Sequence, residues 1–90
     1  VAYVVQLRVA PTFVAALPSY FGDHIRARLA QASPPEPDGW LTLELAFESL
    51  EAARNRLLAL GGGVEVVKPL ALRKSLLDFA TQTVAVYQQA

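Results

Sequence analysis

The sequence predicts an α+β domain of the ferredoxin-like type, a βαββαβ sandwich with a four-stranded antiparallel sheet and a long C-terminal helix. Three observations support this fold class. Stretches of alternating apolar and polar residues recur along the chain, and helical spacing fills intervals between them. The expected order is strand, helix, strand, strand, helix, strand, which is the split βαβ plan. In that plan the helices share one face of the sheet and the other face stays open.

The first strand is expected over residues 3–9, where apolar side chains at odd positions alternate with Gln6 and Arg8. This period of two is typical of a strand with one buried face. A short helix should follow, because Pro11 suits the first helical turn and Pro18 ends the run of apolar spacing.

A second strand is expected to end near Ala32, again from alternation. Its inward residues would be Ile25, Ala27 and Leu29, and its outward residues His24, Arg26 and Arg28. Residues 33–39 contain three prolines and the pair Asp38-Gly39, so they should turn the chain back instead of continuing a ladder. The third strand then alternates cleanly over residues 41–47.

A second helix should begin at Ser49, a natural N-cap, with Glu51 in the first turn where a carboxylate meets the positive end of the helix dipole. Its buried stripe would be Leu50, Ala53, Leu57 and Leu60. The glycines at 61–63 should end it. A short fourth strand is expected over residues 64–68, closed by Pro69.

The last helix should run from Leu70 to about Gln88, and its apolar residues form two stripes instead of one. The surplus stripe consists of Leu70, Leu77 and Val84. A surface helix packed on a single neighbour needs only one apolar stripe. The surplus stripe therefore predicts a partner surface.

From the core-facing phase of each element we expect a common core. Its members would be Leu7, Leu29, Leu43, Leu45, Leu57 and Val66. With 53% apolar residues in 90, the chain suits one domain spanning residues 1–90. The chain begins with Val1 and has no Met, which suggests a piece of a longer protein.

Composition excludes several classes of function. Eight basic and eight acidic residues cancel, so no polycationic footprint for non-specific duplex binding is present. The absence of cysteine removes thiol chemistry, and no apolar run approaches a membrane span. We expect a cytoplasmic domain with no membrane contact, no cofactor and no metal, since His24 is the only histidine and one imidazole cannot build a zinc site.

Several motifs in order carry a family resemblance. They are Val5-Gln6-Leu7-Arg8-Val9, Pro37-Asp38-Gly39-Trp40-Leu41, Ser49-Leu50-Glu51-Ala52-Ala53, Leu60-Gly61-Gly62-Gly63-Val64-Glu65-Val66-Val67-Lys68-Pro69 and Ala85-Val86-Tyr87. Together they resemble, over essentially the whole chain, the C-terminal extension (WCX) domain of WYL-domain bacterial transcriptional regulators. Two departures are the early Pro18 and the missing acidic residue between Pro69 and Leu72.

The resemblance implies a regulatory C-terminal domain without enzymatic activity, in a homodimeric regulator that also carries a helix-turn-helix and a WYL domain. DNA would be bound through the parent chain only, and the effector in some members is a nucleic acid or nucleotide. The candidate effector-binding or interdomain residues are Arg8, Arg26 and Arg28, whose planar guanidinium forks suit anions. The candidate partner interface consists of Trp40, Leu70, Leu77 and Val84.

Simpler interpretations stand beside these. The arginines could line a solvated face and pair with Glu44 and Glu65, and Trp40 could cover the hairpin. An alternative function is a small-molecule-binding regulatory domain of the ACT kind, although the ligand-binding glycine of such domains is missing from residues 9–12. An acylphosphatase-type enzyme would need a glycine-rich phosphate cradle and a water-orienting asparagine, and neither pattern is present.

Overall fold

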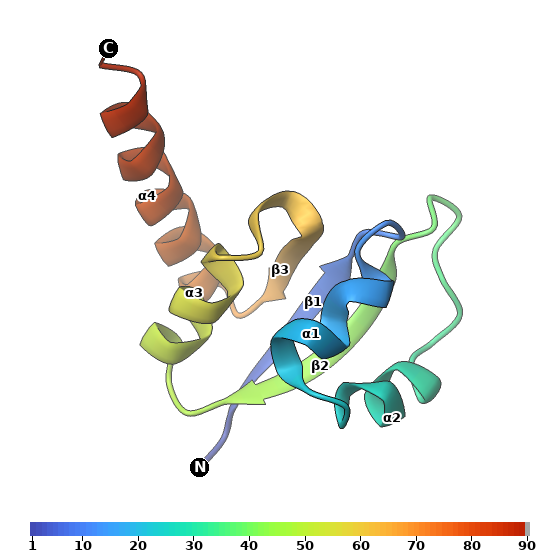
Figure 1. Cartoon of the computed structure of the whole chain (residues 1–90). Helices are drawn as coiled ribbons and strands as arrows, with labels where there is room; N and C mark the ends of the chain where they lie inside the picture. Colours follow the sequence, from blue (N-terminus) through green and yellow to red (C-terminus); the bar gives the residue numbers. More distant parts are fainter. Residues whose placement is uncertain (90) are drawn as a thin grey trace.

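The computed structural model describes residues 1–89, which form a small three-stranded sheet with helices on one face and a long helix at the C-terminal end (Figure 1). The strands are β1 (Tyr3–Val9), β2 (Leu41–Phe47) and β3 (Val64–Lys68). The α-helices are α1 (Leu17–Phe21), α2 (Ile25–Ala30), α3 (Leu50–Leu58) and α4 (Leu70–Tyr87). Two short 3-10 turns, η1 (Val14–Ala16) and η2 (Gly61–Gly63), precede α1 and β3.

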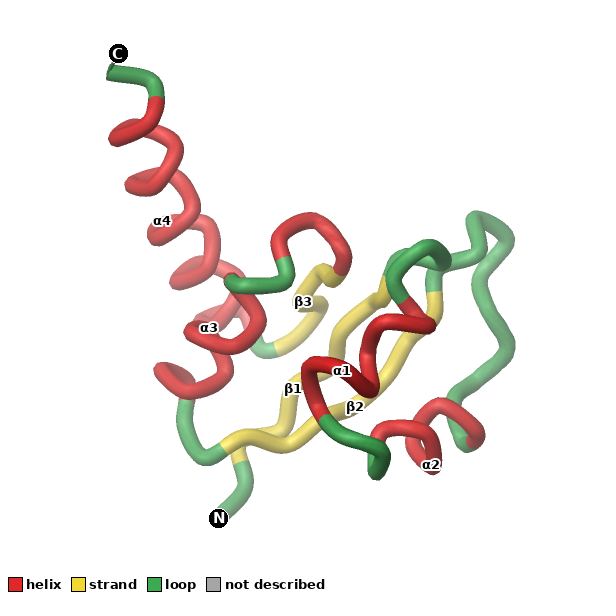
Figure 2. The backbone as a smooth tube through the Cα atoms, viewed as in Figure 1, coloured by secondary structure: helices red, strands yellow, loops and turns green. Residues whose placement is uncertain are grey.

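The sheet has the order β2-β1-β3, and both pairings are antiparallel (Figure 2). Leu7 in the central strand lies opposite Leu43 on one side and opposite Val66 on the other. Because side chains alternate between the faces of a strand, this register gathers the apolar residues on one face. It leaves Gln6 and Arg8 on the other face, as the alternation predicted.

The predicted four-stranded sheet is wrong in one element. The segment expected as a second strand forms helix α2, so the described residues contain a three-stranded sheet in place of the ferredoxin-like one. Ile25 and Leu29 are four residues apart, a spacing that fits one face of a helix as well as one side of a strand. Burial distinguishes the two, since Ile25 is fully buried and Leu29 half-buried while Ala27, placed inward by the strand pattern, is exposed.

The core lies between the sheet and the helices that cover one face of it. The fully buried large side chains are Leu7, Leu17, Ile25, Leu57, Leu72, Val5 and Val9. Of the residues predicted to share the core, all are buried except Leu29, which is half-buried and packs against its edge. Residues of α2 therefore contribute to the core as expected, but they do so from a helix and not from a strand.

Helix α3 begins at the predicted N-cap and ends at Leu58, shortly before the glycines that were expected to stop it. Ser49 Oγ accepts a hydrogen bond from the Ala52 amide at 3.0 Å, which satisfies one of the free N–H groups of the first turn. Gly61 has φ of 58°, the left-handed conformation that favours glycine at a helix end. Gly63 serves another purpose, because a Cβ there would lie 2.7 Å from the ring of Phe13.

Helix α4 packs on the domain only through its first half. Leu72 is its one buried residue, and from Thr81 to Gln89 every residue is exposed. The second half projects away from the sheet (Figure 1). No helix within residues 1–89 combines the length and apolarity needed to cross a membrane.

Candidate functional site

Arg8 stands at the centre of an ion-pair cluster on the open face of the sheet. Its Nε donates to Glu36 Oε2 at 3.0 Å, its Nη2 to Asp38 Oδ2 at 2.6 Å and its Nη1 to Glu65 Oε1 at 2.8 Å. The guanidinium also lies 4.9 Å from the centre of the Trp40 ring. One arginine thus connects the proline-rich loop, the central strand and β3.

The electrostatics of this cluster follow from its pairing. The hydrogen bonds to Glu36 and then Glu65 raise the pKa of Arg8 above its ordinary value. The hydrogen bond from Arg8 is in turn the largest influence that lowers the pKa of Glu65, and a second bond from Arg73 acts in the same direction. The carboxyl of Glu65 is therefore held in its charged form more firmly than an isolated glutamate would be.

The loop that carries two of these carboxylates is shaped by its own hydrogen bonds. Asp38 Oδ1 accepts from the Trp40 amide at 3.0 Å, and the Glu36 amide donates to the Trp40 carbonyl at 2.9 Å. Gly39 has φ of 86°, a conformation that the turn requires and other residues rarely adopt. The Pro-Asp-Gly sequence therefore builds a turn that presents its acidic side chains to Arg8.

Arg26 and Arg28 do not share the open face with Arg8, so their predicted placement on a strand is wrong. Both lie on α2, whose buried Ile25 packs in the core on the opposite side of the sheet. Both are exposed, and the Arg26 Nε is 3.5 Å from Asp23. Their role in binding an effector or a neighbouring domain stays a prediction, and it concerns a different surface from the one around Arg8.

The predicted partner residues of α4 are exposed along its length. Leu70, Leu77 and Val84 have exposed fractions of 62%, 69% and 50%. Val86 and Tyr87, near the end of the helix, are exposed at 68% and 82%. Trp40 was predicted to belong to the same partner interface. It is half-buried beside Arg8, just before β2, and is not part of α4.

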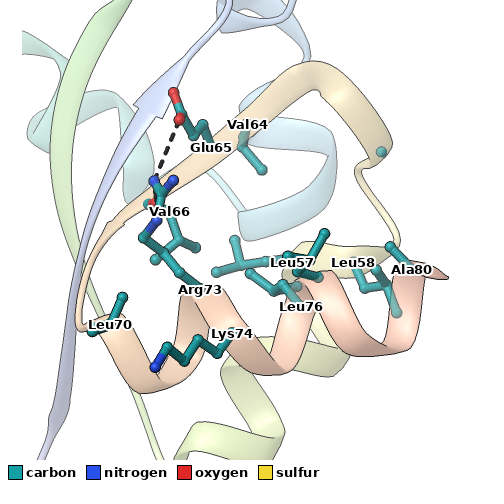
Figure 3. A pocket seen from close by; sticks show the side chains of 12 residues that line it. Leu57, Leu58, Val64, Glu65, Val66, Leu70, Arg73, Lys74, Leu76 and Ala80 are labelled. Carbon is teal, nitrogen blue, oxygen red and sulfur yellow. Dashed lines mark hydrogen bonds and ion pairs between the residues drawn. The ribbon is translucent and has the colours of Figure 1, made fainter. Parts of the chain in front are cut away.

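Arg54 of α3 contacts the first half of α4 through a hydrogen bond and an aromatic ring. Arg54 Nη1 lies 3.2 Å from Ser75 Oγ, and its guanidinium is 4.0 Å from the centre of the Phe79 ring. Between α3, α4 and β3 the surface is hollowed into a groove of about 530 Å³, shown in Figure 3. Arg73 crosses one end of this groove to Glu65 and to the Val66 carbonyl.

Sequence reasoning named Arg8 and offered Glu44 and Glu65 as carboxylates that could pair with the arginines. Glu65 pairs with Arg8, whereas no ion pair of Glu44 occurs within residues 1–89. Glu36, Asp38 and Arg73 were missed. An acidic pair in a turn next to a strand that carries an outward arginine is a usable signal. The contacts of Arg73 with β3 had no such signal, because they depend on the angle at which α4 leaves the sheet.

Within residues 1–89 no group of three or more His, Cys, Asp or Glu side chains is placed to hold a metal ion. The single histidine, His24, is exposed at the start of α2.

A family model described as the WCX domain matches residues 2–84, nearly the whole chain. No curated protein matches the chain significantly.

Proposed function

The chain belongs to the WCX family, and from this we propose that it is the non-catalytic regulatory C-terminal domain of a WYL-type transcriptional regulator. In this proposal the domain contributes to homodimer formation and to the response of the regulator to an effector. The helix-turn-helix and WYL domains of the same parent chain would supply DNA binding and part of the effector site. The effector would be a nucleic acid or a nucleotide.

The observation that supports a partner-organising role is the exposed second half of α4. The helix has 18 residues, yet only Leu72 is buried. Isolated helical segments of one or two turns are marginal in water, so a projecting end gains stability mainly by packing on another surface. Leu77 and Val84, which are exposed on one side of the helix, give such a surface apolar area to bury.

We place the dimer contact on the stripe Leu70, Leu77 and Val84. Residues spaced by seven stay on one side of a helix, which is the pattern by which two helices pack along their length. Two copies of α4 meeting on this stripe would each cover the other's apolar residues about a two-fold axis.

The dimer proposal is tested by light scattering on the chain and on two single variants. Leu77→Glu puts a charge into the stripe and should convert dimers to monomers. Gln82→Glu adds the same charge on the opposite side of α4 and should leave the mass unchanged. If Leu77→Glu leaves the mass of the chain and of the intact regulator unchanged, the stripe is not the dimer contact.

The second half of the proposal concerns anion recognition. Arg26 and Arg28 are exposed on α2 and available to phosphate oxygens. Arg8 differs, because its donors already contact three carboxylates of the same chain, and an anionic effector would have to displace them. We therefore expect the double change of Arg26 and Arg28 to alanine to weaken effector-dependent DNA binding by the intact regulator at fixed salt. Unchanged binding would place the effector site in the other domains.

A further inference from the structure

Strand β2 lies at one edge of the sheet and pairs only with β1 among the strands of residues 1–89 (Figure 2). Every second residue of an edge strand directs its N–H and C=O groups away from the sheet. In the described part of the chain, these outward groups of residues 41–47 have no backbone hydrogen-bond partner. The segment that the sequence predicts as the neighbouring strand forms α2 instead, so it does not pair with this edge.

The two edges of the sheet differ in how they are protected. β3 has five residues, a register irregularity against β1 between Gln6 and Leu7, and Lys68 followed by Pro69 at its end. Short length, bulges, lysine and proline are features by which proteins prevent the pairing of an edge strand. β2 has seven residues in continuous register with β1 and contains no lysine or proline. Its edge therefore has the length and regularity that strand addition requires.

The side of β2 that belongs to the open face of the sheet is acidic. Glu44 is exposed there, and Glu48 is exposed directly after the strand. Neither glutamate forms an ion pair within residues 1–89. Between Arg28 and Arg54 the sequence has five acidic residues and no basic one. A basic side chain that reached this edge would therefore meet carboxylates without a competing cation from the same segment.

On the core side of the same edge, apolar side chains are only half-buried. Leu41 of β2 and Leu29 of the neighbouring helix α2 pack against the core but remain partly exposed. A strand added to β2 would place every second side chain on this side of the sheet. Apolar side chains there would remove more of this surface from water.

We propose that β2 binds an extended segment of another protein by strand addition, and that the segment alternates lysine or arginine with apolar residues. The outward N–H and C=O groups of β2 would pair with the backbone of the segment. Its basic side chains would lie on the side of Glu44, and its apolar side chains on the side of Leu41. A second copy fits this edge less well, because two β2 strands would bring their unpaired carboxylates together. The proposal depends neither on the effector nor on the stripe of α4.

The probe is an acetylated and amidated peptide of alternating lysine and valine, seven residues long like β2. On binding, hydrogen exchange should slow at alternate amides of residues 41–47 and stay unchanged in residues 64–68 and 70–87. A peptide with glutamate in place of lysine should bind about tenfold more weakly, because it places like charges beside Glu44.

Methylation of the peptide backbone separates strand addition from simple charge attraction. Neighbouring residues of a strand direct their N–H groups to opposite edges, and only one edge of the peptide can pair with β2. N-methylation of one alternate set of residues should therefore abolish binding, whereas N-methylation of the other set should be tolerated.

Variants of the chain test the charge on the strand. Glu44→Gln should weaken the lysine–valine peptide about threefold. Ala46→Lys should weaken it about tenfold, because the new lysine lies beside the basic side chains of the peptide. Glu51→Gln, in the first turn of α3, removes the same charge away from β2 and should leave the affinity unchanged. All three positions are exposed, so the variants should fold as the parent does.

Equal binding of the lysine and glutamate peptides, tolerance of both methylated sets, or slowed exchange outside β2 would each overturn the proposal. Slowed exchange in residues 41–47 that grows with chain concentration in the absence of peptide would assign the edge to a second copy and would also overturn it. Light scattering on the same samples reports the mass. Loss of peptide binding at unchanged mass therefore rejects only this inference, and loss of the dimer with peptide binding retained rejects only the dimer contact on α4.

Discussion

Arg8 and Glu65 are direct partners across the antiparallel ladder of β1 and β3, and their side chains meet at 2.8 Å on the open face of the sheet. Opposite charges placed directly across two strands stabilise the pairing. Here the pair is extended at both ends, by the acidic loop on one side and by Arg73 of α4 on the other. The shortest strand of the sheet is thereby linked to both the loop and the terminal helix.

Glu65→Gln should lower the stability at neutral pH by at most about 1 kcal/mol, because the glutamate is partly exposed to solvent. The pKa of Glu65 is lowered by folding, so its contribution is present above the ordinary glutamate pKa and is lost as the pH falls through the lower folded value. Urea unfolding of both proteins should therefore show a larger difference at pH 7 than at an acidic pH below the ordinary glutamate pKa. Glu44→Gln, a glutamate on the same face, serves as the control. A difference of equal size at both pH values would contradict the assignment.

Leu43→Ala should cost about 2–5 kcal/mol, the range for truncation of a buried leucine. Leu43 lies opposite Leu7 in the sheet and is 4% exposed. Val4→Ala, on the open face of β1, should cost less than about 1 kcal/mol. Chemical denaturation measures both, and comparable losses in the two variants would show that the apolar face has been assigned to the wrong side.

Gly63→Ala should destabilise the domain by about 1–3 kcal/mol, because the added methyl group would overlap the ring of Phe13 at 2.7 Å. Gly62→Ala is a matched control, since no heavy atom lies within 4 Å of a Cβ at that position. It should be neutral or stabilising by up to about 1 kcal/mol. Thermal unfolding measures both. Shortening Phe13 to leucine should make the Gly63→Ala change less costly, and an unchanged cost would rule out the proposed overlap.

Arg54→Ala should loosen the first half of α4. The change removes the hydrogen bond to Ser75 and the stacking on Phe79. The Arg54 Nε is buried without a hydrogen-bond partner within residues 1–89, and its burial offsets part of the stability that these two contacts provide. We therefore expect Arg54→Ala to lower the free energy of unfolding by about 1 kcal/mol. Hydrogen exchange should rise in residues 70–80 while residues 3–9 stay protected. Arg28→Ala, at an exposed site, should alter neither segment.

The prediction of the elements succeeded where two local signals agreed. Strand β2 has clean alternation over seven residues, and α3 has both an N-cap serine and a glycine stop. It failed at α2, where a six-residue segment satisfies the period of a strand and of a helix at once. Over so short a segment only burial distinguishes the two, and burial depends on neighbours that are remote in the chain.

The sequence by itself determined the open and buried faces of β1 and β2, the turn at Asp38-Gly39, the limits of α3 and the exposed stripe of α4, because each depends on residues close together in the chain. Tertiary structure alone decided that α2 is a helix, that Arg8 is enclosed by Glu36, Asp38 and Glu65, and that α3, β3 and α4 enclose a groove. These features depend on distances between segments that are 28 and 57 residues apart for Arg8 with Glu36 and Glu65. Such distances follow from how the sheet and helices pack, and no local periodicity encodes them.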